Sequence, residues 1–297
     1  MQDTSTRVLD HIVHLTPPGT VQQALDSFKS LGFKVFEGGT HADGLTSNAL
    51  VVLADGAYLE LIAFTHAASW YSPGSDERRR REAHRWATKK PGWIDFAFLG
   101  NGSKTTRISD IINARGKVDG SGTVYRSEVE GGRIRPDGSP AEESVLPFFC
   151  GDLTPRELRV SSSNLGCHTY STWAYRFLLQ PPSNTVHPCT AAGVAHVHVL
   201  AEDRLIQHLS QQFTSVIGER PVLSSSQSFK WSLQTSSMAS SKRSCELILS
   251  VPVSEEERAF IGGEEHGLYE IGFWVKEGQQ PGSVLTPYGR IIWVNAN

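Results

Sequence analysis

Three ionisable side chains lie inside apolar runs of the sequence. His11 falls within residues 9–14 (LDHIVH), Glu60 within residues 58–64 (YLELIAF) and Asp95 within residues 93–99 (WIDFAFL). A carboxylate that is buried without a partner is costly, so Glu60 and Asp95 either face solvent or meet a cation or hydrogen-bond donors. One imidazole and two carboxylates can bind Zn²⁺, Fe²⁺, Mn²⁺ or Ni²⁺. Such an ion can polarise a carbonyl or stabilise an enediolate.

The strands that carry these residues decide whether they can meet. Side chains alternate between the two faces of a strand, so His11 and His14 are expected to point in opposite directions, with His11 facing a pocket and His14 packing on a helix. A hydrogen-bonded core histidine is the structural alternative for His11. A solvated edge-strand residue is the alternative for Glu60. If both point inward, the first and last strands of one curled unit bring them together.

Residues 8–64 are expected to form a β-α-β-β-β unit. It comprises a strand at 8–15, a helix that Thr20 can cap and Gly32 ends, and strands at 33–36, 48–53 and 57–64. The Asp55-Gly56 pair between two apolar runs predicts a hairpin turn. A second unit of the same order is expected over 92–152, after a charged insertion at 66–90 that contains a helix at 76–82.

The remaining chain is expected to repeat this organisation. Residues 161–193 are a connector rich in Ser, Pro and Thr, and residues 194–297 hold a third βαβββ unit and a shortened fourth. Residues 8–160 would then be a pair of such units. The predicted fold class is α+β, with repeated βαβββ modules that form curled mixed sheets and carry their helices outside.

Internal similarity supports duplication. Residues 9–14 align with 194–199 at the first histidine, 58–62 with 244–248, and 92–98 with 267–273, in the same order. The alignment yields a second candidate set, which consists of His196, Glu246 and Glu270. This set ranks below the first because the fourth unit is short.

These motifs resemble the vicinal oxygen chelate superfamily, and more narrowly its large glyoxalase-like domain proteins. The resemblance is carried by LDHIV and LELI in the first unit, by RPDG at 135–138, by the stretch LPFFCGDLTPR at 146–156 and by His187-Pro188. It implies that a metal ion takes one ligand from the first and one from the last strand of each of two units. This corresponds to His11, Glu60 and Asp95, with a fourth from residues 146–152, where Phe149 and Cys150 occupy the centre. Whether a divalent metal or none is bound stays open.

The resemblance implies a small-molecule enzyme, namely a lyase or isomerase that acts on an oxygenated metabolite through an enolate-like intermediate. His11 and Glu60 would be catalytic, and substrate contacts would come from Asp95, Phe149, Arg156 and His187. The alternative is a metal-free binding or sequestration protein whose pocket walls would include Phe96, Phe98, Phe148 and Phe149. An extradiol-type dioxygenase is disfavoured because it needs two histidines and one carboxylate, and each candidate set holds one histidine.

The composition and net charge of the chain limit the kinds of molecule that it is expected to bind. The chain has 297 residues, of which 39% are hydrophobic and 20% charged, and its formal net charge is −3. This charge favours neither nucleic acid nor an anionic membrane, so the expected partner is a small molecule. The first residues lack a secretory signal, and the four cysteines show no paired spacing. A cytoplasmic protein is therefore expected. The expected oligomeric state is a monomer or a homodimer, since edge strands of such units often pair.

Overall fold

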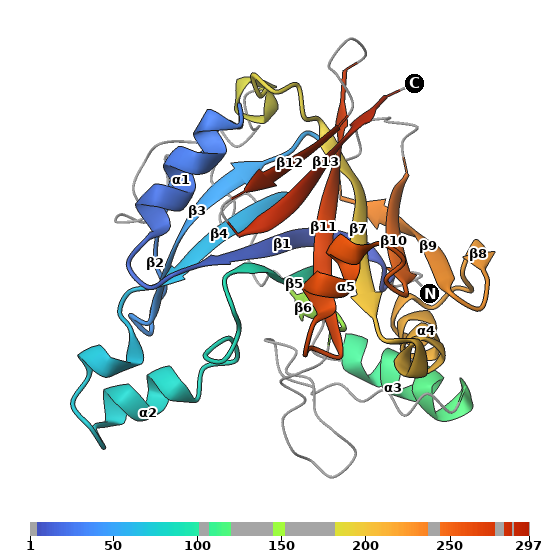
Figure 1. The fold of residues 1–297 in the computed structure, drawn as a ribbon, viewed down its shortest axis with the longest axis horizontal. Helices are drawn as coiled ribbons and strands as arrows, with labels where there is room; N and C mark the ends of the chain where they lie inside the picture. Colours follow the sequence, from blue (N-terminus) through green and yellow to red (C-terminus); the bar gives the residue numbers. More distant parts are fainter. Residues whose placement is uncertain are drawn as a thin grey trace.

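The computed structural model describes residues 5–100, 107–119, 145–151, 182–236, 244–276, 282–286 and 288–296. Their strands form one sheet with the order β12-β13-β11-β7-β10-β9-β1-β4-β3-β2, and β5, β6 and β8 branch from it. Helices lie on the outside of the curled sheet (Figure 1). The α+β class predicted from the sequence is confirmed.

The first half of the chain is built around β1 (Val8–Thr16). Helix α1 (Val21–Ser30) follows it, and strands β2 (Phe36–Thr40), β3 (Thr46–Val52) and β4 (Tyr58–Phe64) complete the unit, with β4 parallel to β1. Next come the short helices η1 (Ala68–Trp70) and α2 (Asp76–Glu82), and Ser75 caps α2 through its side chain. Strand β5 (Gly92–Leu99) pairs antiparallel with β1, followed by helix α3 (Ile108–Asp119) and strand β6 (Phe148–Cys150), which pairs with β5.

The second half repeats these pairings. After η4 (Pro182–Thr185), the chain forms β7 (Gly193–Ala201), α4 (Asp203–Ile217), β8 (Leu223–Ser224), β9 (Ser228–Thr235) and β10 (Cys245–Ser250), with β10 parallel to β7. Helix α5 (Glu255–Ile261) precedes β11 (His266–Val275), which is antiparallel to β7. Strands β12 (Gly282–Thr286) and β13 (Gly289–Asn295) end the sheet. A short parallel contact between β1 and β9 joins the halves.

The backbone irregularities are also repeated. Along β1, residues Leu9 and His11 pair with neighbouring residues of β5, so Asp10 is an extra residue in a bulge. Along β7, Val194 and His196 pair with neighbouring residues of β11, so Ala195 is extra at the matching place. The two halves therefore share a local backbone feature that the sequence similarity did not reveal.

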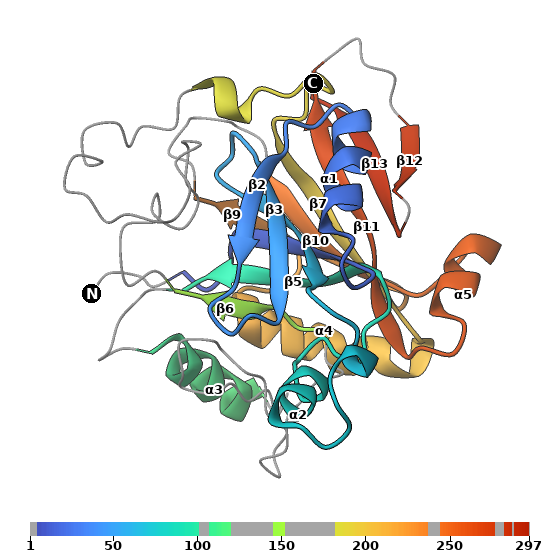
Figure 2. The ribbon, with the colours of Figure 1, turned by 90° about the vertical axis from the view of Figure 1, so that its left-hand side faces the viewer.

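The largest hydrophobic core lies between the sheet and the helices. Helix α1 contacts β3 and β4, helix α4 contacts β9 and β10, and α3 lies beside α4 (Figure 2). The core draws on both halves and includes the fully buried Phe28, Phe213 and Trp231. On β7, the side chains of Val197, Val199 and Ala201 belong to this core, so they lie on the face of the sheet that α1 and α4 cover.

Three local expectations need correction. The Thr20 hydroxyl donates to the Pro17 carbonyl and does not cap α1. The strand expected at 33–36 begins at Phe36, because residue 33 belongs to the core and the ladder to β3 starts at 36. Helix α5, which was not predicted, is stabilised by a capping box between Ser254 and Glu257. Residues 120–144 of the second unit expected over 92–152 lie outside the described residues.

No helix in the described part of the chain is long and apolar enough to cross a membrane.

Candidate functional site

The two faces of β1 separate its two histidines as alternation predicts. His14 is buried against the rings of Phe28 on α1 and Trp93 on β5, with centroid distances of 5.2 and 4.7 Å. His11 lies on the other face, which it shares with Val13 and with Glu60 of β4. The expected packing of His14 against a helix is confirmed. His11, on the other face beside Glu60, is the histidine of β1 that could take part in catalysis.

Asp10 orients the His11 ring. His11 Nδ1 lies 2.6 Å from Asp10 Oδ2, and both side chains are buried. Neighbouring residues on a regular strand point to opposite faces, so this contact depends on the bulge at Asp10. Because a carboxylate only accepts, Nδ1 carries the proton of the neutral ring, and Nε2, which lies on the side of Glu60, carries the lone pair.

Glu60 faces His11 Nε2 across a short gap. Glu60 Oε2 lies 3.9 Å from His11 Nε2, while Oε1 accepts from Asn48 Nδ2 at 2.6 Å and lies 3.5 Å from His41 Nε2. Burial alone would raise the pKa of Glu60. The His41 hydrogen bond, electrostatic interaction with the rings of His11 and His41, and the Asn48 amide outweigh burial, so the pKa is lowered and the carboxylate stays ionised.

Aromatic side chains enclose the imidazole of His11. The Tyr58 ring stacks on it at 4.7 Å between centroids, and the Phe148 ring meets it edge-on at 5.2 Å. The side chain of His11 is 4% exposed and that of Glu60 10%, whereas that of His41 is 45% exposed. His41 is therefore the member of this group that solvent reaches most easily. Its contact with Glu60 gives it a place in the site, although it was not among the site residues predicted from the sequence.

Asp95 lies on the same face of the sheet as His11 and Glu60 but does not take part in their contact. It pairs with Val13 across β1 and β5, its Oδ2 accepts from the Trp86 indole at 3.2 Å, and its Oδ1 accepts from the Phe96 amide. Among the described residues, no group of three or more His, Cys, Asp or Glu side chains is placed to hold a metal ion. The set predicted from His11, Glu60 and Asp95 is thus not assembled as a metal site here.

Two other predicted substrate contacts lie elsewhere. Phe149 faces the main core, where its ring meets that of Phe98, because alternation along β6 gives Phe148 the His11 face. His187 is buried and ties two strand-flanking segments together: its Nδ1 accepts from the Lys34 amide and its Nε2 donates to the Val52 carbonyl. Burial lowers the pKa of His187, so it stays neutral. Arg156 lies outside the described residues, as does Asp152, the last residue of the stretch expected to supply a fourth ligand.

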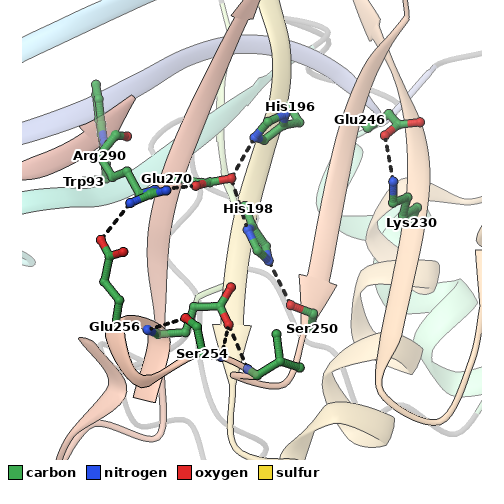
Figure 3. A network of polar contacts seen from close by, with 12 residues as sticks. Trp93, His196, His198, Lys230, Glu246, Ser250, Ser254, Glu256, Glu270 and Arg290 are labelled. Carbon is green, nitrogen blue, oxygen red and sulfur yellow. Dashed lines mark hydrogen bonds and ion pairs between the residues drawn. The ribbon is translucent and has the colours of Figure 1, made fainter. Parts of the chain in front are cut away.

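The second candidate set is also only partly assembled. His196 Nε2 lies 3.1 Å from Glu270 Oε1, but Glu246 lies apart from them and forms an ion pair with Lys230 at 3.5 Å (Figure 3). The cause is strand register. His196 pairs with Glu246 whereas His11 pairs with Tyr58, so the structural counterpart of Glu246 is Tyr58, two residues from Glu60.

His198 takes part in the second cluster in place of Glu246. Its Nδ1 lies 3.5 Å from Glu270 Oε1 and its Nε2 lies 2.8 Å from Ser250 Oγ. Arg290 Nε donates to the other Glu270 oxygen at 2.9 Å. Burial alone would raise the pKa of Glu270, but hydrogen bonds from His196 and His198 and electrostatic interaction with both rings outweigh it, and the pKa is held well below its usual range.

Comparison with known proteins gives the chain a family context. A sequence model for the glyoxalase-like domain matches residues 9–217. No curated protein matches the chain. Among solved structures, a hypothetical protein from Staphylococcus aureus superposes with a TM-score of 0.58 at 10% identity, covering 97% of this chain and 98% of that one. A mutant of 4-hydroxymandelate synthase from Streptomyces coelicolor has a TM-score of 0.50 at 12% identity and covers 96% and 78%. At these identities the likeness concerns the fold alone.

Proposed function

Because the chain belongs to the glyoxalase-like domain family, with the fold of the vicinal oxygen chelate superfamily, we propose that it is a lyase or isomerase acting on a small oxygenated metabolite. The observation that carries the proposal is the buried line Asp10–His11–Glu60. Asp10 fixes the tautomer of His11, and the ionised carboxylate of Glu60 lies 3.9 Å from His11 Nε2.

The line supports proton transfer. His11 Nε2 would take a proton from a carbon beside a carbonyl, and the proton on Nδ1 would stay with its bond to Asp10. Glu60 would stabilise the imidazolium that results. The oxygen of the substrate enolate would gain a proton from His41, whose side chain is exposed and whose Nε2 lies at the far side of Glu60. The enol oxygen then gives its proton back to His41 as the carbonyl re-forms. Return of the His11 proton to a different carbon gives isomerisation, and expulsion of a neighbouring group, which takes up that proton, gives elimination.

Metal chemistry belongs to the family but is not needed for these steps. Asp95 accepts from the Trp86 indole and from the Phe96 amide, so the predicted donor set does not fit an ion among the described residues. Elemental analysis of the purified chain tests that conclusion directly. Stoichiometric Zn, Fe, Mn or Ni that disappears in His11→Ala would restore the metal-assisted form of the proposal.

A binding protein is the second candidate, and one observation favours it. The His11 ring is sandwiched by Tyr58 and Phe148 and is almost fully buried, which suits retention of a flat molecule as well as turnover. Such a protein would bind ligand through the same face but leave the carbon-bound hydrogen of the ligand in place.

Hydrogen exchange separates the two functions. The chain is incubated in D₂O with a panel of small α-hydroxy and α-oxo carbonyl compounds, and NMR follows loss of the α-proton signal. We expect catalysed exchange with at least one compound, slowed about 100-fold or more in His11→Gln and Glu60→Gln. His208→Gln, on the exposed side of α4, is the matched control. Binding detected by calorimetry without exchange would assign the sequestration role. Equal exchange in wild type and His11→Gln would refute the catalytic one.

A further inference from the structure

A row of polar side chains crosses four adjacent strands in the second half of the chain. Ser250 on β10, His198 on β7, Glu270 on β11 and Arg290 on β13 follow one another across the sheet (Figure 3). We propose that Ser250, His198 and Glu270 form a second catalytic site, which hydrolyses small carboxylic esters through an acyl intermediate on Ser250.

The connectivity is that of a nucleophile, a base and an orienting acid. Ser250 Oγ lies 2.8 Å from His198 Nε2, and His198 Nδ1 lies 3.5 Å from Glu270 Oε1. The ionised Glu270 requires the proton on Nδ1, which leaves Nε2 to accept the serine hydroxyl proton. Catalytic contacts of this kind are often long before substrate binds, and the triad is defined by roles rather than by chain order.

The surroundings hold the three groups in place. Arg290 donates from Nε to Glu270 Oε2 and from Nη1 to Glu256 on α5, so the carboxylate is fixed on its second oxygen. The His198 ring meets Tyr269 edge-on at 5.8 Å, which limits its rotation. Each member of the row sits on a strand that is paired with the next, and sites on paired strands are held more firmly than sites on loops.

None of the three side chains is fully buried. The side chains of His198 and Glu270 are 12% and 13% exposed, and Ser250, at the end of β10, is half-buried like them. A small reagent can therefore reach the serine hydroxyl, while protein covers most of the carboxylate that orients the histidine. The first half lacks this row, because Val13 and Asp95 stand at the positions of His198 and Glu270.

The reaction balances with water as the only co-reactant. Ser250 Oγ attacks the ester carbonyl carbon as its proton passes to His198 Nε2. The ester C–O bond then breaks, and the alcohol leaves with that proton. Water next attacks the acyl group, again giving a proton to His198, and Ser250 is released together with a carboxylic acid.

Labelling of the full chain by a fluorophosphonate, a reagent for activated serines, tests the proposal. Peptide mass spectrometry locates the label, and release of p-nitrophenol from p-nitrophenyl acetate gives the rate of acylation. We expect the label on Ser250, loss of acylation in Ser250→Ala, and an acylation rate about 100-fold or more lower in His198→Gln. Ser232→Ala, which removes a half-buried serine from neighbouring β9, should acylate like the wild type.

Three results would overturn the proposal: a label on another residue, an unchanged rate in His198→Gln, or a wild-type Ser250 that reacts no faster than the other serines. Far-ultraviolet circular dichroism reports whether each variant is folded. If Ser250→Ala fails to fold, the position and rate of the wild-type label decide the question without it.

Discussion

Mild acid is expected to weaken the fold through His14. Burial lowers the pKa of His14 from 6.5 to about 3, and His14 Nδ1 has no hydrogen-bond partner among the described residues. The folded state therefore binds a proton at His14 less readily than the unfolded state does. The stability that depends on neutral His14 is fully present above pH 6.5 and is lost as the pH falls from 6.5 toward 3.

The size of the effect follows from the shift. Each pKa unit corresponds to about 1.4 kcal/mol, so this one residue lowers the free energy of unfolding by about 2 kcal/mol between pH 6.5 and 5. His14→Phe keeps a ring between Phe28 and Trp93 and removes the titration. The bond from His14 Nε2 to Thr286 Oγ1 is lost, but that hydroxyl keeps its bond to the Gly289 carbonyl.

Urea unfolding at several pH values, followed by tryptophan fluorescence, measures the difference. The free energy of unfolding of the wild type should fall more steeply than that of His14→Phe below pH 6.5, by about 1.4 kcal/mol per pH unit. His208→Phe, at an exposed position of α4, controls for loss of a histidine and gain of a phenylalanine. Parallel curves for wild type and His14→Phe would refute the reasoning, because they would show that His14 titrates equally in both states.

Three further predictions concern contacts that hold the sheet. Burial raises the pKa of Asp55 from 3.8 to about 6, so the wild type loses stability as the pH rises through this range and Asp55 ionises. Asp55→Asn has no such loss. It should be less stable than the wild type at pH 4, and by pH 7 the difference in the free energy of unfolding should shift in its favour by up to about 3 kcal/mol, as measured by urea unfolding. Gly193→Ala would place a Cβ 2.6 Å from Asp55 Oδ2 and should lower the free energy of unfolding by about 1–3 kcal/mol in thermal unfolding. Gly39→Ala is the control, because a Cβ at residue 39 meets no atom within 4 Å and should cause no loss from steric overlap. Trp86→Phe removes the indole donor to buried Asp95 and should cost about 1–3 kcal/mol by the same assay; an unchanged unfolding midpoint would contradict this.

Periodicity was sufficient to separate the two histidines of β1. The alternation of residues 9–14 put His11 and His14 on opposite faces, which needs only the period of two of an extended chain and is local information. The approach of Glu60 to His11 was predicted only for the case in which both point inward, because it depends on the parallel pairing of β4 with β1. The duplication was also readable, because three short segments recur in order.

Irregular backbone was not readable in the same way. The bulge brings Asp10 beside His11, which strict alternation forbids, and nothing in LDHIVH marks the extra residue. Phe149 was assigned to the site and Phe148 shares the His11 face, since the phase of a three-residue strand cannot be set from so short a segment. His41 approaches Glu60 across the β3 hairpin, a contact that depends on register.

The second cluster shows the same limit from another side. Aligning the repeats on sequence identity made Glu246 the counterpart of Glu60, whereas the ladder of β7 and β10 pairs it with His196 and so makes it the counterpart of Tyr58. His198 was not predicted, and its counterpart in the first half, Val13, is apolar. The two halves differ by two residues in the register between their first and last strands, and an alignment of short sequence motifs cannot detect such a difference.

The extra residue that both halves carry changes which side chains can share one face of a strand. At this position the first half has Asp10, whose carboxylate reaches His11, and the second half has Ala195, which has no polar atom to offer His196. One identical backbone irregularity therefore supports an oriented imidazole in one half and leaves the orientation of the other imidazole to Glu270 on the neighbouring strand.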